Sequence, residues 1–195
     1  VRTAGSGRAL QATATPSRKP PDGDADGDTL VEEQLPFAPA GPDAAPYPMA
    51  LGPFPVGVRT YEFHDESRPN AQTGLPRRLV VEVWYPAVQA ARDMPRYAYD
   101  IVAEAAGEDL GASRDAVLES GLEPLSSLAV REPELDRSHA PYPLLVFSHG
   151  SNGIRWQSLF YTEHLASHGY IVAAVDHEGN TLWNLIKDGW DSMSV

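Results

Sequence analysis

Cysteine is absent from the 195-residue chain, which excludes disulfide bridges, thiolate metal sites and a cysteine nucleophile. Positive charge is scarce: 15 Lys and Arg stand against 27 Asp and Glu, a formal net charge of -12. We therefore expect no nucleic-acid partner, because phosphate binding needs a clustered positive field. We also expect no membrane span, because no stretch approaches the roughly 20 apolar residues that one requires. The compartment stays open: residues 1–30 show no apolar signal region, and an exported protein fits the composition as well as a cytoplasmic one does.

The first 50 residues differ in composition from the rest of the chain. They hold eight of the 18 prolines and only two aromatic residues. Such a stretch buries too little apolar surface to offset the entropy of ordering it. We predict a disordered acidic, Pro-rich leader over residues 1–50 and a partial α/β domain over residues 51–195.

Alternating aspartates within this leader have the spacing of a calcium-binding loop. Prolines flank them where such a loop has amphipathic helices, so the favoured interpretation is a solvated acidic linker. The aspartates are Asp22, Asp24, Asp26 and Asp28.

Two segments after the leader show the alternation of β-strands. Residues 56–63 and 79–85 alternate in polarity, turn-forming residues separate them, and Pro86 follows the second. We predict an antiparallel pair at the edge of a sheet. Residues 92–137 have helical composition at 99–106 and 113–120, which predicts a helical insertion.

The next segment predicts a βαβ unit. Residues 144–147 and 170–175 are continuous apolar runs, typical of strands covered on both faces. Residues 155–168 between them are long enough for a helix and end at Gly169. A parallel pair with a right-handed crossover follows. The polar loops at 148–153 and 176–181 should then lie together at the sheet edge where ligands of such folds bind.

The first of these loops suits an oxyanion hole. His149 and Gly150 follow the strand, and glycine lets the chain turn tightly. Backbone N–H groups just after this turn can point into a cleft, where they would stabilise a developing negative charge.

The longer string from Phe147 to Asn180 resembles the α/β-hydrolase fold, and within it the platelet-activating-factor acetylhydrolases and their bacterial relatives. The matching motifs are Phe-Ser-His-Gly at 147–150, Leu-Ala-Ser-His-Gly at 165–169, Ile-Val-Ala-Ala at 171–174 and Asp-His at 176–177. The strands at 52–58 and 79–87 look like the opening of that family. The resemblance implies the N-terminal half of an α/β-hydrolase sheet, with antiparallel strands followed by the parallel βαβ unit.

The same resemblance implies a serine carboxylic-ester hydrolase with a Ser-His-Asp triad, no metal or other cofactor, and a small-molecule or phospholipid ester as substrate. Carried over by position, the oxyanion loop is His149, Gly150 and Ser151. The backbone N–H of Ser151 would be one donor and His149 would support the loop. Trp183 lies in a segment that the family places near the substrate entrance.

The nucleophile elbow of this fold, G-x-S-x-G, does not occur in the chain. The nearest sequence is residues 149–153, in which His149 stands in place of the first glycine. We therefore expect the triad to lie beyond residue 195 and this chain alone to be inactive. Ser151 as nucleophile with His177 as base is an alternative.

Two further interpretations remain. One is a truncated or degraded product that binds a ligand without catalysis. The other is a metal-dependent hydrolase in which His149, Asp176 and His177 hold the metal.

Overall fold

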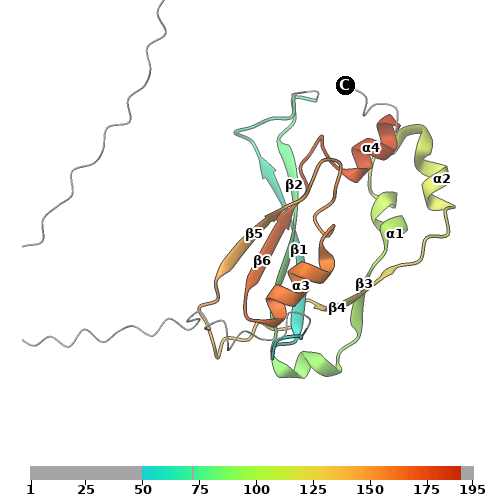
Figure 1. Cartoon of the computed structure of the whole chain (residues 1–195). Coiled ribbons are helices and arrows are strands. Elements are labelled where there is room, and N and C mark those ends of the chain that lie inside the picture. Colours follow the sequence, from blue (N-terminus) through green and yellow to red (C-terminus); the bar gives the residue numbers. More distant parts are fainter. Residues whose placement is uncertain (1–49, 72, 190–195) are drawn as a thin grey trace, which may run out of the picture. The chain divides into compact units, whose positions relative to one another are not determined.

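A computed structural model describes residues 50–71 and 73–189, so the predicted leader lies outside the described residues except for Ala50. The described part forms one six-stranded mixed sheet in the order β3-β4-β1-β2-β6-β5 (Figure 1). None of its helices is long and apolar enough to cross a membrane. The strands are β1 (Val56–Asp65), β2 (Arg77–Pro86), β3 (Arg96–Tyr99), β4 (Leu125–Arg131), β5 (Leu144–Ser148) and β6 (Ile171–Val175). The helices are η2 (Gln89–Asp93), α1 (Ile101–Ala106), η3 (Gly111–Ser113), α2 (Arg114–Leu118), α3 (Leu159–Ser167) and α4 (Leu182–Asp188).

Strands β1 and β2 form the predicted antiparallel pair, in register from Val56 opposite Pro86 to Asp65 opposite Arg77. Their predicted place at the sheet edge is wrong. β4 pairs in parallel with the outer side of β1, and β3 pairs with β4. These two strands fall inside the segment expected to be helical. β4 carries Ser126 and Ser127 among its apolar residues, so its sequence has no clean strand periodicity and its pairing with β1 decides its structure.

The helices of that segment are shorter than expected. α1 begins at Ile101, because the carboxylate of Asp100 caps the helix by accepting hydrogen bonds from the N–H groups of Val102 and Ala103. Tyr99 is therefore the last residue of β3 and not the first of a helix.

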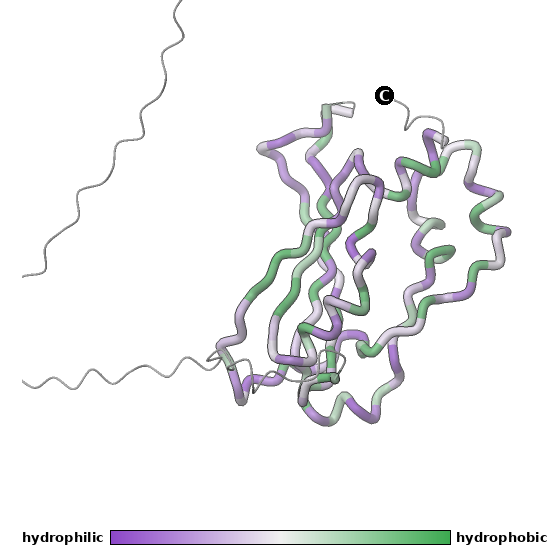
Figure 2. Tube along the Cα trace, viewed as in Figure 1, coloured by the Kyte–Doolittle hydropathy of each residue, from purple (hydrophilic) through white to green (hydrophobic). Residues whose placement is uncertain are grey.

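The βαβ unit is confirmed: β5 and β6 are parallel, and α3 connects them. Gly169 ends the α3 segment with a φ of 96°, a left-handed conformation that favours glycine. The expected cover of β5 on both faces is wrong. β5 is an edge strand, and Leu144 and Val146 remain 62% and 75% exposed. In Figure 2 the tube is green along both β5 and β6.

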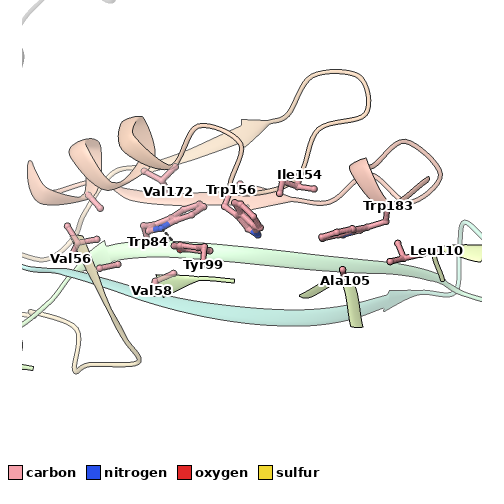
Figure 3. Packing of buried hydrophobic residues seen from close by; sticks show 13 residues of the cluster. Val56, Val58, Trp84, Tyr99, Ala105, Leu110, Ile154, Trp156, Val172 and Trp183 are labelled. Atoms are coloured by element: carbon pink, nitrogen blue, oxygen red, sulfur yellow. Dashed lines mark hydrogen bonds between the residues drawn. The ribbon is translucent and has the colours of Figure 1, made fainter. Parts of the chain in front are cut away.

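The core lies on the face of the sheet that α3 covers, where this helix contacts β1, β2, β4 and β6. Figure 3 shows Trp84, Tyr99 and Trp156 packed together beneath Val172. The indole Nε1 of Trp84, which is fully buried, donates to the hydroxyl of Tyr99 at 3.0 Å, so the polar atom of this ring is satisfied.

Replacing Tyr99 with Phe tests this buried hydrogen bond. We expect Tyr99→Phe to lower the free energy of unfolding by about 1–3 kcal/mol, because the Trp84 N–H loses its acceptor while the ring packing is kept. Urea denaturation followed by tryptophan fluorescence measures the change. Tyr161→Phe is the matched control, since Tyr161 is 51% exposed. Equal stability of both variants would contradict the role of the hydrogen bond.

Candidate functional site

The loops after β5 and β6 meet at the carboxyl ends of these two strands, as predicted. Gly153 and Thr181 form an isolated parallel bridge, and the N–H of Leu182 donates to the carbonyl of Gly153 at 2.9 Å. Asn180 also contacts the first loop: its Oδ1 accepts from the N–H of Asn152 at 2.9 Å and from the hydroxyl of Ser151 at 3.3 Å. The second loop therefore holds the first in place.

Three backbone N–H groups of the first loop have an acceptor within the protein, and the N–H of Ser151 differs from them. Gly150 donates to Oε1 of Gln157 at 3.2 Å, Asn152 donates to Asn180, and Gly153 donates to the carbonyl of Gly150 at 3.0 Å. Within residues 50–71 and 73–189, no acceptor is found for the N–H of Ser151, and this residue is exposed. The loop thus presents one backbone donor that its own structure does not use.

The tight turn of this loop depends on Asn152 and Gly153, and not on Gly150 as expected. Asn152 has the left-handed conformation, with a φ of 56°, a region that asparagine enters more readily than most residues. A Cβ at Gly153 would lie 2.0 Å from Oε1 of Gln157 and 3.1 Å from the carbonyl oxygen of Gly150, so a side chain there would displace the Gln157 amide from the loop. Gly150 has neither a positive φ nor such a clash.

His149 is buried beneath the loop, and both of its ring nitrogens are engaged. Its Nε2 accepts a hydrogen bond from the backbone N–H of His177 at 3.0 Å. The ring proton is therefore on Nδ1, which donates to the carbonyl of Gly150 at 2.7 Å. His149 thus connects the two loops through both of its ring nitrogens.

His177 contacts a serine, but not the one considered from the sequence. Its Nε2 lies 2.7 Å from Oγ of Ser148, the last residue of β5. The Ser151 hydroxyl donates to Asn180. The hydrogen bonds thus contradict a Ser151–His177 pair of nucleophile and base.

A buried cluster of charged side chains binds Asp176, the first residue of the second loop. The guanidinium of Arg155, 3% exposed, donates to Asp176 at 2.7 Å, to Glu104 at 2.7 Å and to Glu82 at 3.0 Å. The backbone N–H of Arg155 also donates to Asp176 at 2.6 Å. Arg131 contacts the other oxygen of Glu82 at 2.9 Å.

Sequence reasoning missed this cluster, although one signal was available. Glu82 occupies an inward position of the alternating strand β2, flanked by buried Val80 and Trp84 two residues away on either side. A carboxylate at such a position needs a cationic partner. Arg155 supplies it: burial disfavours the charge, yet the carboxylates of Glu104, Asp176 and Glu82 raise the pKa of Arg155 above its usual value.

The proposed three-residue metal site is contradicted by these contacts. Both nitrogens of His149 and both carboxylate oxygens of Asp176 already have protein partners. No group of three or more potential metal-ligating side chains gathers anywhere in the described part of the chain.

Trp183 lies on α4 and lines a cavity of about 410 Å³. Arg78 and Val80 of β2, Asp176 and Glu178 of the second loop, and Lys187 of α4 also line it. Trp183 is 4% exposed and belongs to the hydrophobic cluster, and its Nε1 has no hydrogen-bond partner among the described residues. His149, Gly150 and Ser151 do not line this cavity, so the structure does not bring Trp183 and the first loop into one pocket.

Comparisons with known proteins give a family. Residues 43–184 match the family model described as platelet-activating factor acetylhydrolase, isoform II. Among solved structures, a ferulic acid esterase from Streptomyces cinnamoneus is 28% identical with a TM-score of 0.46, over 64% of this chain. This chain covers only 34% of the length of that esterase. No curated protein matches the chain.

Removing the guanidinium tests the buried charge cluster. We expect Arg155→Ala to lower the free energy of unfolding by about 3–5 kcal/mol, because the carboxylates of Glu82 and Asp176 stay buried without a cation. Chemical denaturation measures the loss. Arg68→Ala, which breaks an exposed ion pair with Asp65, is the control and should leave stability nearly unchanged. Similar losses in the two variants would refute the cluster's importance.

The imidazole of His177 should titrate below the ordinary histidine value of 6.5. Burial lowers the pKa of His177 and the adjacent His149 lowers it further, while Asp176 opposes them. The folded state then binds fewer protons than the unfolded chain just below pH 6.5. The stability contributed by neutral His177 is therefore complete above that pH and is lost as pH falls through the lowered pKa. Histidine NMR measures the titration, with His177→Gln identifying the signal; a pKa at or above 6.5 would exclude this environment.

Proposed function

Because this chain belongs to the platelet-activating factor acetylhydrolase isoform II family, we propose that it provides the oxyanion-hole segment of a serine carboxylic-ester hydrolase. The partial domain from residue 51 onward would carry this segment. The observation that supports the proposal is the backbone N–H of Ser151, which has no acceptor among the described residues while the N–H groups on either side of it are engaged.

In the proposed mechanism, a serine attacks the ester carbonyl and the carbonyl oxygen becomes negatively charged in the tetrahedral intermediate. The Ser151 N–H donates to that oxygen. The donor needs little reorganisation, because Asn180 and Gln157 already fix the loop on both sides of Ser151. In well-studied hydrolases, one such donor contributes about 2.7–4 kcal/mol to stabilisation of the transition state.

The nucleophile, base and acid of the triad are assigned to residues outside these 195, since the sequence contains no G-x-S-x-G elbow. The second oxyanion donor would be the N–H that follows the elbow serine. This chain alone would then not sustain turnover.

The proposed substrate is a small-molecule or phospholipid ester, with short-acyl phospholipids as the class that the family name suggests. The family resemblance places Trp183 near the substrate entrance, but Trp183 lines a cavity that His149, Gly150 and Ser151 do not line, so this proposal gives it no contact with the reacting ester. The chemistry proposed here needs no metal or other cofactor.

A non-catalytic product is the second candidate. It is favoured by the outer side of β5, which pairs with no other strand among residues 50–71 and 73–189 and where Leu144 and Val146 are exposed. An unpaired apolar strand edge promotes aggregation.

Sequencing the gene beyond codon 195 separates the two candidates, and we expect a continued reading frame with G-x-S-x-G. In the protein from that frame, Ser151→Pro removes the N–H and should lower kcat for p-nitrophenyl acetate by about 10²–10³-fold. Ser151→Ala keeps the N–H and is the matched control, with activity close to wild type.

Three outcomes would contradict the proposed function. The first is a stop codon directly after residue 195, which favours the non-catalytic product. The second is equal activity of Ser151→Pro and Ser151→Ala. The third is sustained turnover by the 195-residue chain that Ser151→Ala abolishes, since Ser151 would then be the nucleophile.

A further inference from the structure

The hydroxyl of Ser148 has the geometry of an activated nucleophile. Its Oγ lies 2.7 Å from Nε2 of His177, a normal length for a hydrogen bond between a hydroxyl and an imidazole. Ser148 is exposed and ends the edge strand β5, so a reagent can approach it from the open side of the sheet. A serine next to a histidine base is the basic unit of nucleophilic hydrolases.

The base of this pair is held by the fold. The backbone N–H of His177 donates to His149, and the two imidazole rings lie 4.4 Å apart between centroids. The preceding residue, Asp176, is bound by Arg155 from below. Burial lowers the pKa of His177, so its imidazole is neutral at pH 7 and can accept a proton.

We propose that Ser148 and His177 form a nucleophilic dyad that reacts with activated acyl and phosphonyl esters, independently of any elbow serine. With the ring proton of His177 on Nδ1, the Ser148 hydroxyl donates to Nε2. Attack on a fluorophosphonate forms the Oγ–P bond and breaks the P–F bond. Fluoride leaves, and the hydroxyl proton passes to Nε2 of His177 and then to water.

Other serines near histidines lack this arrangement. Ser138 lies 2.8 Å from Nδ1 of His139, but its hydroxyl also donates to the carboxylate of Asp136. A hydroxyl has one proton, so Asp136 competes with the imidazole for it. The hydroxyl of Ser151 donates to Asn180. Ser148 has His177 as its only side-chain partner in the described part of the chain.

The dyad lacks the third group of a triad. Both oxygens of Asp176 are engaged by Arg155, and His177 Nδ1 has no acceptor among residues 50–71 and 73–189. An acid that orients the base speeds both attack and release. The Ser148 site therefore forms a covalent adduct but releases an acyl group slowly, which agrees with the absence of sustained turnover proposed for this chain.

A biotinylated fluorophosphonate tests the dyad on the 195-residue chain, which has no elbow serine to compete for the probe. Intact-mass analysis should show one adduct, and peptide mapping should place it on Ser148. Ser148→Ala should abolish labelling. His177→Gln should slow labelling by about 10²-fold or more, because the general base is lost. Ser138→Ala is the matched control and should label at the wild-type rate.

His177→Gln keeps the backbone N–H that binds His149, so the loops should remain in place, and circular dichroism checks the fold. Failure to label Ser148, or an unchanged labelling rate in folded His177→Gln, would overturn the dyad. If that variant does not fold, the position of the adduct in the wild-type chain decides. None of these results depends on the Ser151 N–H, so they are separate from the test of the proposed function.

Discussion

The ion pairs of the buried Arg155 guanidinium are the interaction on which the rest of this structure depends. They join three carboxylates from separate parts of the chain: Glu82 in the middle of β2, Glu104 on α1 and Asp176 after β6. Burying these charges is costly, and only close pairing with full hydrogen bonding offsets the cost. That requirement gives the cluster one favourable arrangement and fixes where β2, α1 and the loop after β6 lie.

The polar site formed by the two loops depends on Asp176, because a chain of contacts leads from this residue to the first loop. Because Arg155 holds this carboxylate, the next residue, His177, has a defined backbone position from which its N–H reaches His149. His149 in turn binds the carbonyl of Gly150, and Asn180 binds the loop from its other side. Two groups of exposed residues are then held in place with little reorganisation needed: the N–H of Ser151 and the hydroxyl of Ser148. One is suited to stabilising negative charge, the other to forming a covalent bond.

Much of the fold could be predicted from sequence because its signals are local. The alternation in β1 and β2, the apolar runs of β5 and β6, and Gly169 after α3 each follow from a few neighbouring residues. β3 and β4 were not predicted, because β4 depends on pairing with β1, which is distant in the chain, and β3 depends on pairing with β4. The exposure of Val146 was not predicted either. The apolar composition of β5 suits a strand covered on both faces, whereas the strand order places β5 at the edge of the sheet.

The sequence by itself determined the α/β class, the family motifs, and the meeting of the loops that carry His149 and His177, since parallel strands end at one edge of a sheet. Only the tertiary structure decided which groups pair within that site. In the structure, His177 contacts Ser148 and not Ser151. Both ring nitrogens of His149 have hydrogen-bond partners, and Asp176 pairs with Arg155. The physical reason is that a hydrogen bond requires a correct distance between two atoms within a few tenths of an ångström. Residue spacing along the chain does not specify such a distance, whereas the packing of β2, α1 and β6 around one buried cation does.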